Sequence, residues 1–246
     1  MKSNNNMMKV YVWEFPVRFT HWVNFFCILI LSLTGYFMGT EMYSPIYTKQ
    51  YITSWIHFIH FVTAYIFMMS FIVRLYWSIA GNNYADMLKW IPTNRSHCKD
   101  LFNDIKNHMV LDLAASYRIG HTSLGSLMFF LLQVIFLLSL FSGFAMYSLN
   151  HTGEIWKAFG EWVQQTVSLD MIKQYHRVIM YVFLIFAPGH MFMSLLNHFK
   201  LKNNMMISIF SGNKLIKREK IVEELEEEPV KVPMNNSQED ENIHTS

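Results

Sequence analysis

Four long apolar runs limit what this chain can fold into more than any other feature of its sequence. They lie at about residues 19–39, 52–79, 121–149 and 174–199. A helix of about 20 residues crosses the ~30 Å hydrocarbon core of a bilayer, and each run is long enough to do so. A hydrophobic content of 52% is typical of the same class. We therefore predict an all-α membrane protein built as a bundle of four transmembrane helices.

The segments outside these runs are polar. Residues 1–18 form an N-terminal flank, and residues 80–120 form a loop in which we expect one or two short helices near the membrane surface. Residues 211–246 carry charge, Pro and Asn with too little apolar surface to fold alone, so they predict a disordered tail. The transmembrane domain is thus expected to occupy residues 19–210.

Lysine and arginine are distributed unevenly between the two sides of the predicted bundle. The N-terminal flank, the 80–120 loop and the C-terminal flank hold most of them. The opposite side has loops near residues 40–51 and 150–173, whose basic residues are Lys49, Lys157, Lys173 and Arg177. Because cytoplasmic loops carry the excess of positive charge, we expect both termini in the cytoplasm and these two loops outside.

Histidines mark the candidate site. Six of the eleven lie within or at the edges of the apolar runs, where a polar side chain is costly and usually functional: His21, His57, His60, His121, His176 and His190. His176 and His190 are separated by about 3.9 helical turns, which places them on nearly the same face, about 21 Å apart along the axis. The topology sets His21 level with His190, and His60 level with His176.

Two facing neutral imidazoles are the ligand set of a bis-histidine haem b. The two depths therefore predict two such haems stacked across the bilayer. Cys27 and Cys98 form no C-x-x-C-H motif, which agrees with non-covalent attachment. In the second run His57 and His60 are three residues apart and nearly co-facial, so spacing alone allows either. His121 has no partner at its depth, and we expect a structural role or a place beside a haem propionate.

Small and basic residues surround these histidines. Gly35 and Gly143 would let a flat macrocycle approach the backbone, while Gly39 fits close helix packing equally well. The two stretches "TGYF" and "SGFA" form a weak internal echo. Four arginines at the interfaces either pair with propionates or anchor headgroups, and the position of Arg177 beside His176 favours a propionate. The four are Arg18, Arg74, Arg118 and Arg177.

Five stretches of the chain carry a family resemblance. They are "VWEFPVRFTHW", "LTGYFMG", "HFVTAYIFMMSFIVRLYWSIAGNNY", "IGHTSLGSLMFF" with "SGFAMYS", and "YHRVIMYVFLIFAPGH", and together they span residues 11 to about 200. In order and spacing they resemble the cytochrome b subunit of membrane-bound nickel–iron hydrogenases. The chain departs from that pattern at "GHTS", where the family commonly shows Gly-His-Asn-Pro.

The resemblance implies a ligand set and a function. It implies two non-covalent b haems, the cytoplasmic-side one held by His21 and His190 and the outward one by His60 and His176, which decides the second run in favour of His60. It also implies an inner-membrane subunit that passes electrons to a membrane quinone. Its partners would be the small iron–sulfur and large nickel–iron subunits of a periplasmic hydrogenase, with no nucleic acid involved. We see no hydrogen-activating site in this chain, so that chemistry would lie in the partner.

Two alternatives stay open from the sequence. One is the cytochrome b subunit of formate dehydrogenase or a similar quinone-linked oxidoreductase, which has a similar ligand layout. The other is a haem-free transporter whose histidines bind a metal ion or relay protons. Pro188 interrupts the predicted fourth helix and favours the transporter, because transporters often contain broken helices.

Overall fold

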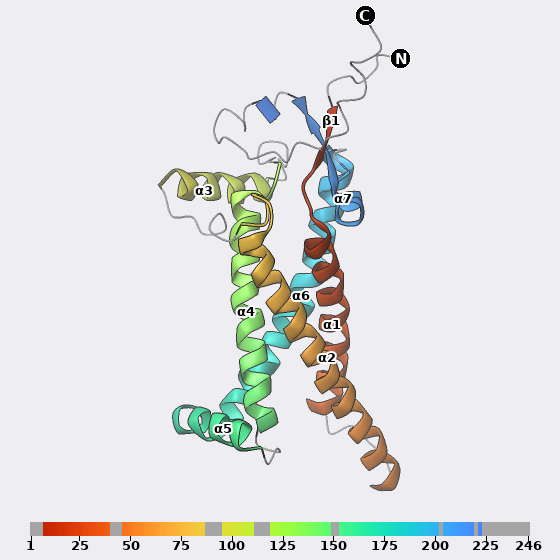
Figure 1. Cartoon of the computed structure of the whole chain (residues 1–246), viewed down its shortest axis with the longest axis vertical. Coiled ribbons are helices and arrows are strands. Elements are labelled where there is room, and N and C mark those ends of the chain that lie inside the picture. The colour runs from red at the N-terminus through yellow and green to blue at the C-terminus, as the bar shows by residue number, and fades with distance from the viewer. Residues whose placement is uncertain are drawn as a thin grey trace, which may run out of the picture.

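The computed structural model describes residues 7–39, 46–86, 95–110, 119–148, 153–201, 204–218 and 221–222. Its frame is four long helices that alternate in direction (Figure 1). They are α1 (Phe15–Gly39), α2 (Ile46–Ala80), α4 (Ser123–Ser148) and α6 (Leu169–Leu201). All four are long and apolar enough to cross a membrane. The predicted all-α transmembrane bundle is confirmed.

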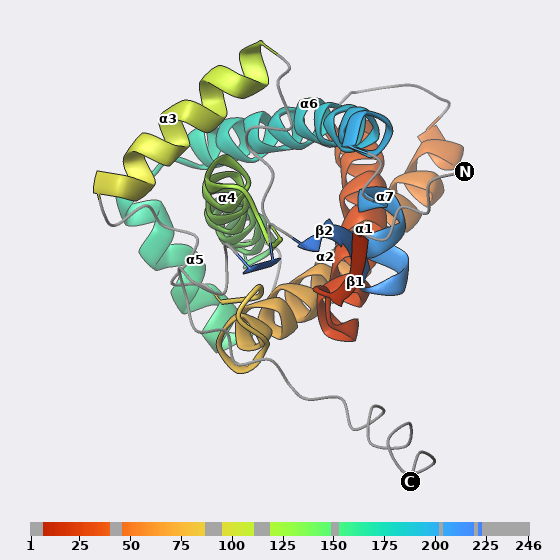
Figure 2. The same cartoon turned by 90° about the horizontal axis from the view of Figure 1, so that it is seen from above.

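The four helices form a closed ring of contacts. α1 packs along α2 and α4 packs along α6, while α1 also touches α6 and α2 touches α4 (Figure 2). The centre of the bundle is filled by one buried apolar cluster to which all four helices contribute: Cys27, Phe67, Phe71, Phe136 and Phe183. This cluster fills the middle of the bundle and joins all four helices there.

The interior of the bundle contains polar as well as apolar side chains, and its outer surface is apolar. The bundle interior buries polar residues that include Thr20, Ser70 and Gln133. The outer surface exposes large apolar side chains, with Ile185 at 77% and Ile79 at 82%. Because lipid tails solvate apolar side chains, such a surface is stable in a bilayer and not in water.

A small sheet closes one end of the bundle, which we call the sheet end. β1 (Met7–Tyr11) pairs antiparallel with β2 (Asn213–Lys217), which follows the short helix α7 (Met205–Ser211). Lys214 is buried beneath this sheet, where its Nζ donates hydrogen bonds to the carbonyls of Ile119 and Gly120 at 2.9 and 3.0 Å. Two distant parts of the chain are thereby joined to the start of α4.

Glu14 provides a second link at the sheet end. Its carboxylate accepts hydrogen bonds from the Trp77 indole N–H and from the backbone N–H of Asn82, both at 2.8 Å. The Asn82 side chain in turn donates to the carbonyl of Val12 at 2.9 Å. These bonds fix the start of α1 against the end of α2.

Shorter helices cover both ends. α3 (Arg95–Met109) lies at the sheet end, which confirms a short helix within the 80–120 loop (Figure 1). α5 (Glu154–Thr166) lies across the opposite end, which we call the α5 end. It buries Gly160 and Val163 while Ile155 and Trp162 stay exposed. An apolar outer edge on a helix at this position is typical of the membrane interface.

Several sequence-based boundaries need correction. α1 begins at Phe15 and α6 at Leu169, earlier than expected. α6 continues through Pro188, because neighbouring turns and helices tolerate one missing donor in a transmembrane helix. The expected disordered tail is wrong for Asn213–Lys217, which form β2 by pairing with the other end of the chain. The residues after 222, and Arg118, lie outside the described residues.

Gly212 offers a test of the sheet end. Its φ is +82°, and an added Cβ would lie 2.5 Å from the Tyr11 ring and 2.7 Å from the Trp13 carbonyl oxygen. We expect Gly212→Ala to destabilise this region by about 1–3 kcal/mol, since both the backbone conformation and the space disfavour a side chain. Thermal unfolding and limited proteolysis in detergent would measure the loss. Gly153→Ala, whose Cβ would make an ordinary 3.6 Å contact, is the control and should behave as wild type.

Candidate functional site

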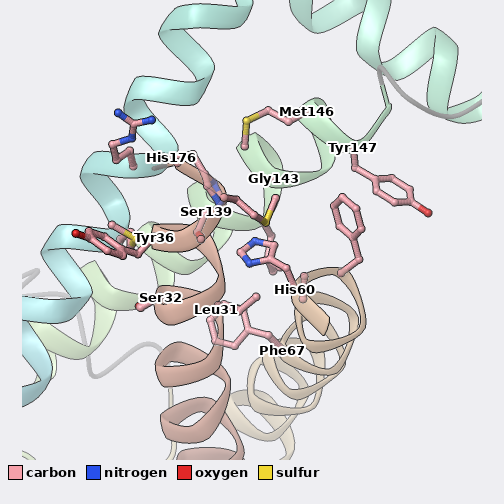
Figure 3. A pocket seen from close by; sticks show the side chains of 18 of the residues that line it. Leu31, Ser32, Tyr36, His60, Phe67, Ser139, Gly143, Met146, Tyr147 and His176 are labelled. Carbon is pink, nitrogen blue, oxygen red and sulfur yellow. The ribbon is translucent and has the colours of Figure 1, made fainter. Parts of the chain in front are cut away.

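Two histidines meet in a pocket near the α5 end. His60 on α2 and His176 on α6 have ring centroids 6.4 Å apart. Both rings reach into the same cavity of about 370 Å³, with Gly143 of α4 beside them (Figure 3). That volume is in the range of cofactor sites, and the lining is mostly apolar.

Each of these two rings has a hydroxyl partner on a neighbouring helix. The Nδ1 atom of His60 lies 2.8 Å from Thr34 Oγ1 of α1. The Nδ1 atom of His176 lies 2.9 Å from Ser142 Oγ of α4. Sequence reasoning missed both hydroxyls, although each immediately precedes a glycine within the "TGYF" and "SGFA" echo. Both histidines therefore have their Nδ1 side occupied by protein.

His57, the alternative in the second run, is placed differently. Its Nδ1 lies 2.8 Å from the carbonyl oxygen of Thr53 in its own helix, and its ring packs near Phe61. It lines the same pocket as His60. The ring that lies opposite His176 is that of His60.

A second histidine pair lies toward the sheet end. His21 on α1 and His190 on α6 also have ring centroids 6.4 Å apart. The ring of Phe186 stacks on His190, and the indole of Trp22 lies against His21. Since α6 is continuous, its two histidines are about 21 Å apart along the helix. The pairs thus occupy two levels of one bundle, with the central phenylalanine cluster on the helices between them.

Basic side chains lie near the histidine pair at each end of the bundle. At the α5 end Lys173 and Arg177 line the pocket, and Arg177 lies so close to α1 that a Cβ on Gly39 would be 3.2 Å from its guanidinium. At the sheet end Arg74 is only 4% exposed, and its guanidinium lies over the Phe129 ring at 4.6 Å. Arg18 instead donates to the carbonyl of Phe210, which ties α1 to α7.

His121 lies in an aromatic stack at the sheet end and not in a histidine pair. Its ring centroid is 4.7 Å from that of Trp13 and 5.8 Å from that of Phe129. Burial and the nearby cations Lys214 and Arg74 lower the pKa of His121 to about 3. It is therefore neutral at physiological pH and adds no positive charge to this end.

The geometry of the two pairs fits a metal bound between imidazoles. A metal–imidazole bond is about 2 Å long and a ring centroid lies roughly 1 Å behind its nitrogen, so two rings on opposite sides of one metal have centroids about 6 Å apart. Both pairs show 6.4 Å. The small residues next to the rings, Gly35 at His60 and Gly143 at His176, leave backbone surface that a flat group can approach. The residues at the α5 end therefore fit haem, and the spacing of the sheet-end pair fits a metal held in the same way.

Comparison with known proteins gives the family. The family model described as prokaryotic cytochrome b561 matches residues 12–212. The chain belongs to this family. It is therefore an integral membrane cytochrome of b type, with haem b as its cofactor and electron transport as its task.

Similar proteins support the same family assignment. The chain is 30% identical to a "Probable Ni/Fe-hydrogenase B-type cytochrome subunit" of Rhizobium leguminosarum bv. viciae over 85% of this chain and 90% of the relative. Proteins of the same description from Cupriavidus necator and Escherichia coli K12 (there "hydrogenase 1") are 28% and 29% identical over 87% and 79% of this chain, and 91% and 86% of the relatives. The resemblance seen in the sequence is confirmed, and the haem-free transporter is disfavoured.

Pigment is the direct test of this cofactor. We expect the purified protein to show the reduced-minus-oxidised absorption bands of b haem after dithionite, because the chain belongs to a family of b-type cytochromes. Acidified acetone should extract all of it, since the chain has no C-x-x-C-H motif. A folded but colourless protein, or pigment that stays with the chain on extraction, would contradict the assignment.

Proposed function

We propose that this chain is the di-haem membrane anchor of a nickel–iron hydrogenase and passes electrons from that enzyme to the membrane quinone pool. The two histidine pairs at two levels of one bundle carry this proposal. Haem b, when bound, takes up and releases one electron at its iron. The role of the chain is to hold two such groups in line between the α5 end and the sheet end.

The proposed axial ligands are His21 with His190 and His60 with His176. In each pair one ring comes from α6 and the other from the α1–α2 half of the bundle. α6 therefore sets the spacing between the two sites. His60 and His176 are hydrogen-bonded through Nδ1 to hydroxyls of α1 and α4, respectively. These bonds support an orientation in which Nε2 of each ring points away from the helix that carries the hydroxyl.

The orientation in the membrane follows from basic residues. The segments that meet at the sheet end hold most of the Lys and Arg, so we place this end and both termini on the cytoplasmic side of the inner membrane. The α5 end then faces the periplasm. His60 and His176 would form the outward site, the nearer one to a periplasmic partner.

The partner is proposed from the relatives. Those described above are all named as cytochrome subunits of Ni/Fe hydrogenases, which favours hydrogenase over formate dehydrogenase. Electrons from H2 would arrive through the small iron–sulfur subunit of such an enzyme, while its large subunit carries the nickel–iron site. We place quinone reduction near the sheet-end pair.

Removing single histidines tests the ligand assignment. We expect His176→Ala and His190→Ala each to lose one of two haems per chain, because each removes one axial nitrogen from a different pair. Pyridine haemochrome would give the haem count. In membranes, H2-dependent quinone reduction should stop while the hydrogenase still reduces a soluble dye.

His57 supplies the matched control for the second helix. We expect His60→Ala to lose one haem and His57→Ala to keep both, since the ring of His57 is bonded within its own helix. The reverse result would make His57 the ligand. Two haems retained after His176→Ala would overturn the pairing as a whole.

The two native cysteines allow a test of orientation. Cys98 on α3 is exposed at the sheet end, whereas Cys27 is buried in the bundle. We expect a membrane-impermeant maleimide to label the chain in inside-out vesicles and not in right-side-out vesicles, with Cys98→Ser abolishing the label. Labelling of right-side-out vesicles at Cys98 would place the sheet end outside.

A further inference from the structure

Both histidines of the α5-end pair are contacted by the same two-residue motif, a hydroxyl residue followed by a glycine. On α1 a hydroxyl residue and a glycine, Thr34–Gly35, meet His60 of α2. On α4 the equivalent pair, Ser142–Gly143, meets His176 of α6. In each case a neighbouring helix, and not the histidine's own, supplies both groups.

The hydrogen bonds of Thr34 decide which nitrogen of His60 carries a proton. The Thr34 hydroxyl lies 2.7 Å from the Ile30 carbonyl oxygen, a contact that requires the hydroxyl proton between the two oxygens. A hydroxyl has only one proton to donate. Toward His60 Nδ1, at 2.8 Å, Thr34 Oγ1 must therefore accept, so that the ring is protonated at Nδ1.

Ser142 repeats this arrangement at His176. Its hydroxyl lies 2.8 Å from the Leu138 carbonyl oxygen and 3.1 Å from that of Ser139, so its proton is directed toward these carbonyls. The contact of Ser142 Oγ with His176 Nδ1 at 2.9 Å is then an N–H donated by the ring. Both rings thus keep an unprotonated Nε2, the atom that can bind a metal.

The glycines next to these hydroxyls leave room for the rings. A Cβ on Gly35 would lie 3.5 Å from Cε1 of His60, and a Cβ on Gly143 would lie 3.3 Å from Cε1 of His176. The second distance is shorter than most real Cβ contacts, so a side chain at Gly143 would crowd the ring of His176. Each glycine therefore leaves room for the ring, and the hydroxyl fixes the tautomer of the ring.

We propose that Thr34 and Ser142 are positioning residues that fix the Nδ1–H tautomer of His60 and His176 and lower the midpoint potential of the α5-end haem. The proposal rests on the proposed function, in which these two histidines are axial ligands. A ring that donates its outer N–H to an acceptor is a more basic ligand toward the metal. A more basic ligand stabilises the oxidised iron, and hydrogen bonding of this kind is one of the levers on haem potential.

The sheet-end pair is built differently. Within the described residues, His21 and His190 make ring contacts with Trp22, with Phe186 and with each other. In the part of the chain that the structure describes, the hydroxyl bonds occur at the α5-end pair and not at the sheet-end pair. Such a difference would set the α5-end haem at the lower potential, which makes electron flow from the α5 end toward the sheet end favourable.

The test is a redox titration of the purified full-length protein carrying Ser142→Ala or Thr34→Val. We expect one of the two midpoint potentials to move to a more positive value while the other stays at the wild-type value. Retention of that haem should also weaken, by about 10- to 100-fold as for other partners of metal-bound histidine. Ser142→Thr and Thr34→Ser keep an acceptor and should restore the wild-type potential.

Ser148→Ala is the matched control, because it removes a buried hydroxyl of α4 that bonds the Ala145 carbonyl and no histidine. It should leave both potentials unchanged. Ser142→Ala decides the outcome should Thr34→Val fail to fold, since Ala is the best helix former. Two haems with unchanged potentials in Ser142→Ala would overturn the role of the hydroxyls and leave the proposed function standing. A wild-type protein with fewer than two haems would instead overturn the proposed function.

Discussion

The bundle depends on one constraint: a polar side chain between transmembrane helices needs a partner, because lipid offers none. At the α5 end, hydroxyls donate to carbonyls of their own helices, and the imidazoles of His60 and His176 are bonded to these hydroxyls of the next helix. These bonds fix the rotation of α1 against α2 and of α4 against α6. The direction in which His60 and His176 point is a consequence of that rotation.

α6 has a special place in this arrangement. It contributes His176 and His190, one ring to each pair, whereas α1 and α2 contribute one ring each. A rigid helix keeps the distance between the two levels constant, and the phenylalanines between them exclude water from the middle of the bundle. The continuity of α6 through Pro188 matters for the same reason, since a broken helix would separate the two levels.

The sheet end is held by contacts between parts of the chain that are far apart in sequence. Buried Lys214 from the C-terminal side is bonded to the carbonyls before α4, while Glu14 from the N-terminal side is bonded to the end of α2. A buried ammonium is stable only where its donors are satisfied. These bonds close the bundle next to the pair of His21 and His190, and they connect the two chain ends to the site.

The sequence by itself determined the four helices, the two levels of histidine and the family, because hydropathy and helical periodicity are local properties and five long stretches carry the resemblance. It did not separate His57 from His60 by spacing, and it predicted a disordered tail where β2 forms. The three-dimensional arrangement was needed to show that His60 faces His176, that β1 pairs with β2, and that Thr34 and Ser142 lie within hydrogen-bond distance of the rings. The physical reason is that each of these depends on how one helix or strand is rotated against another, and a hydrogen bond across that contact is absent from the pattern of either segment alone.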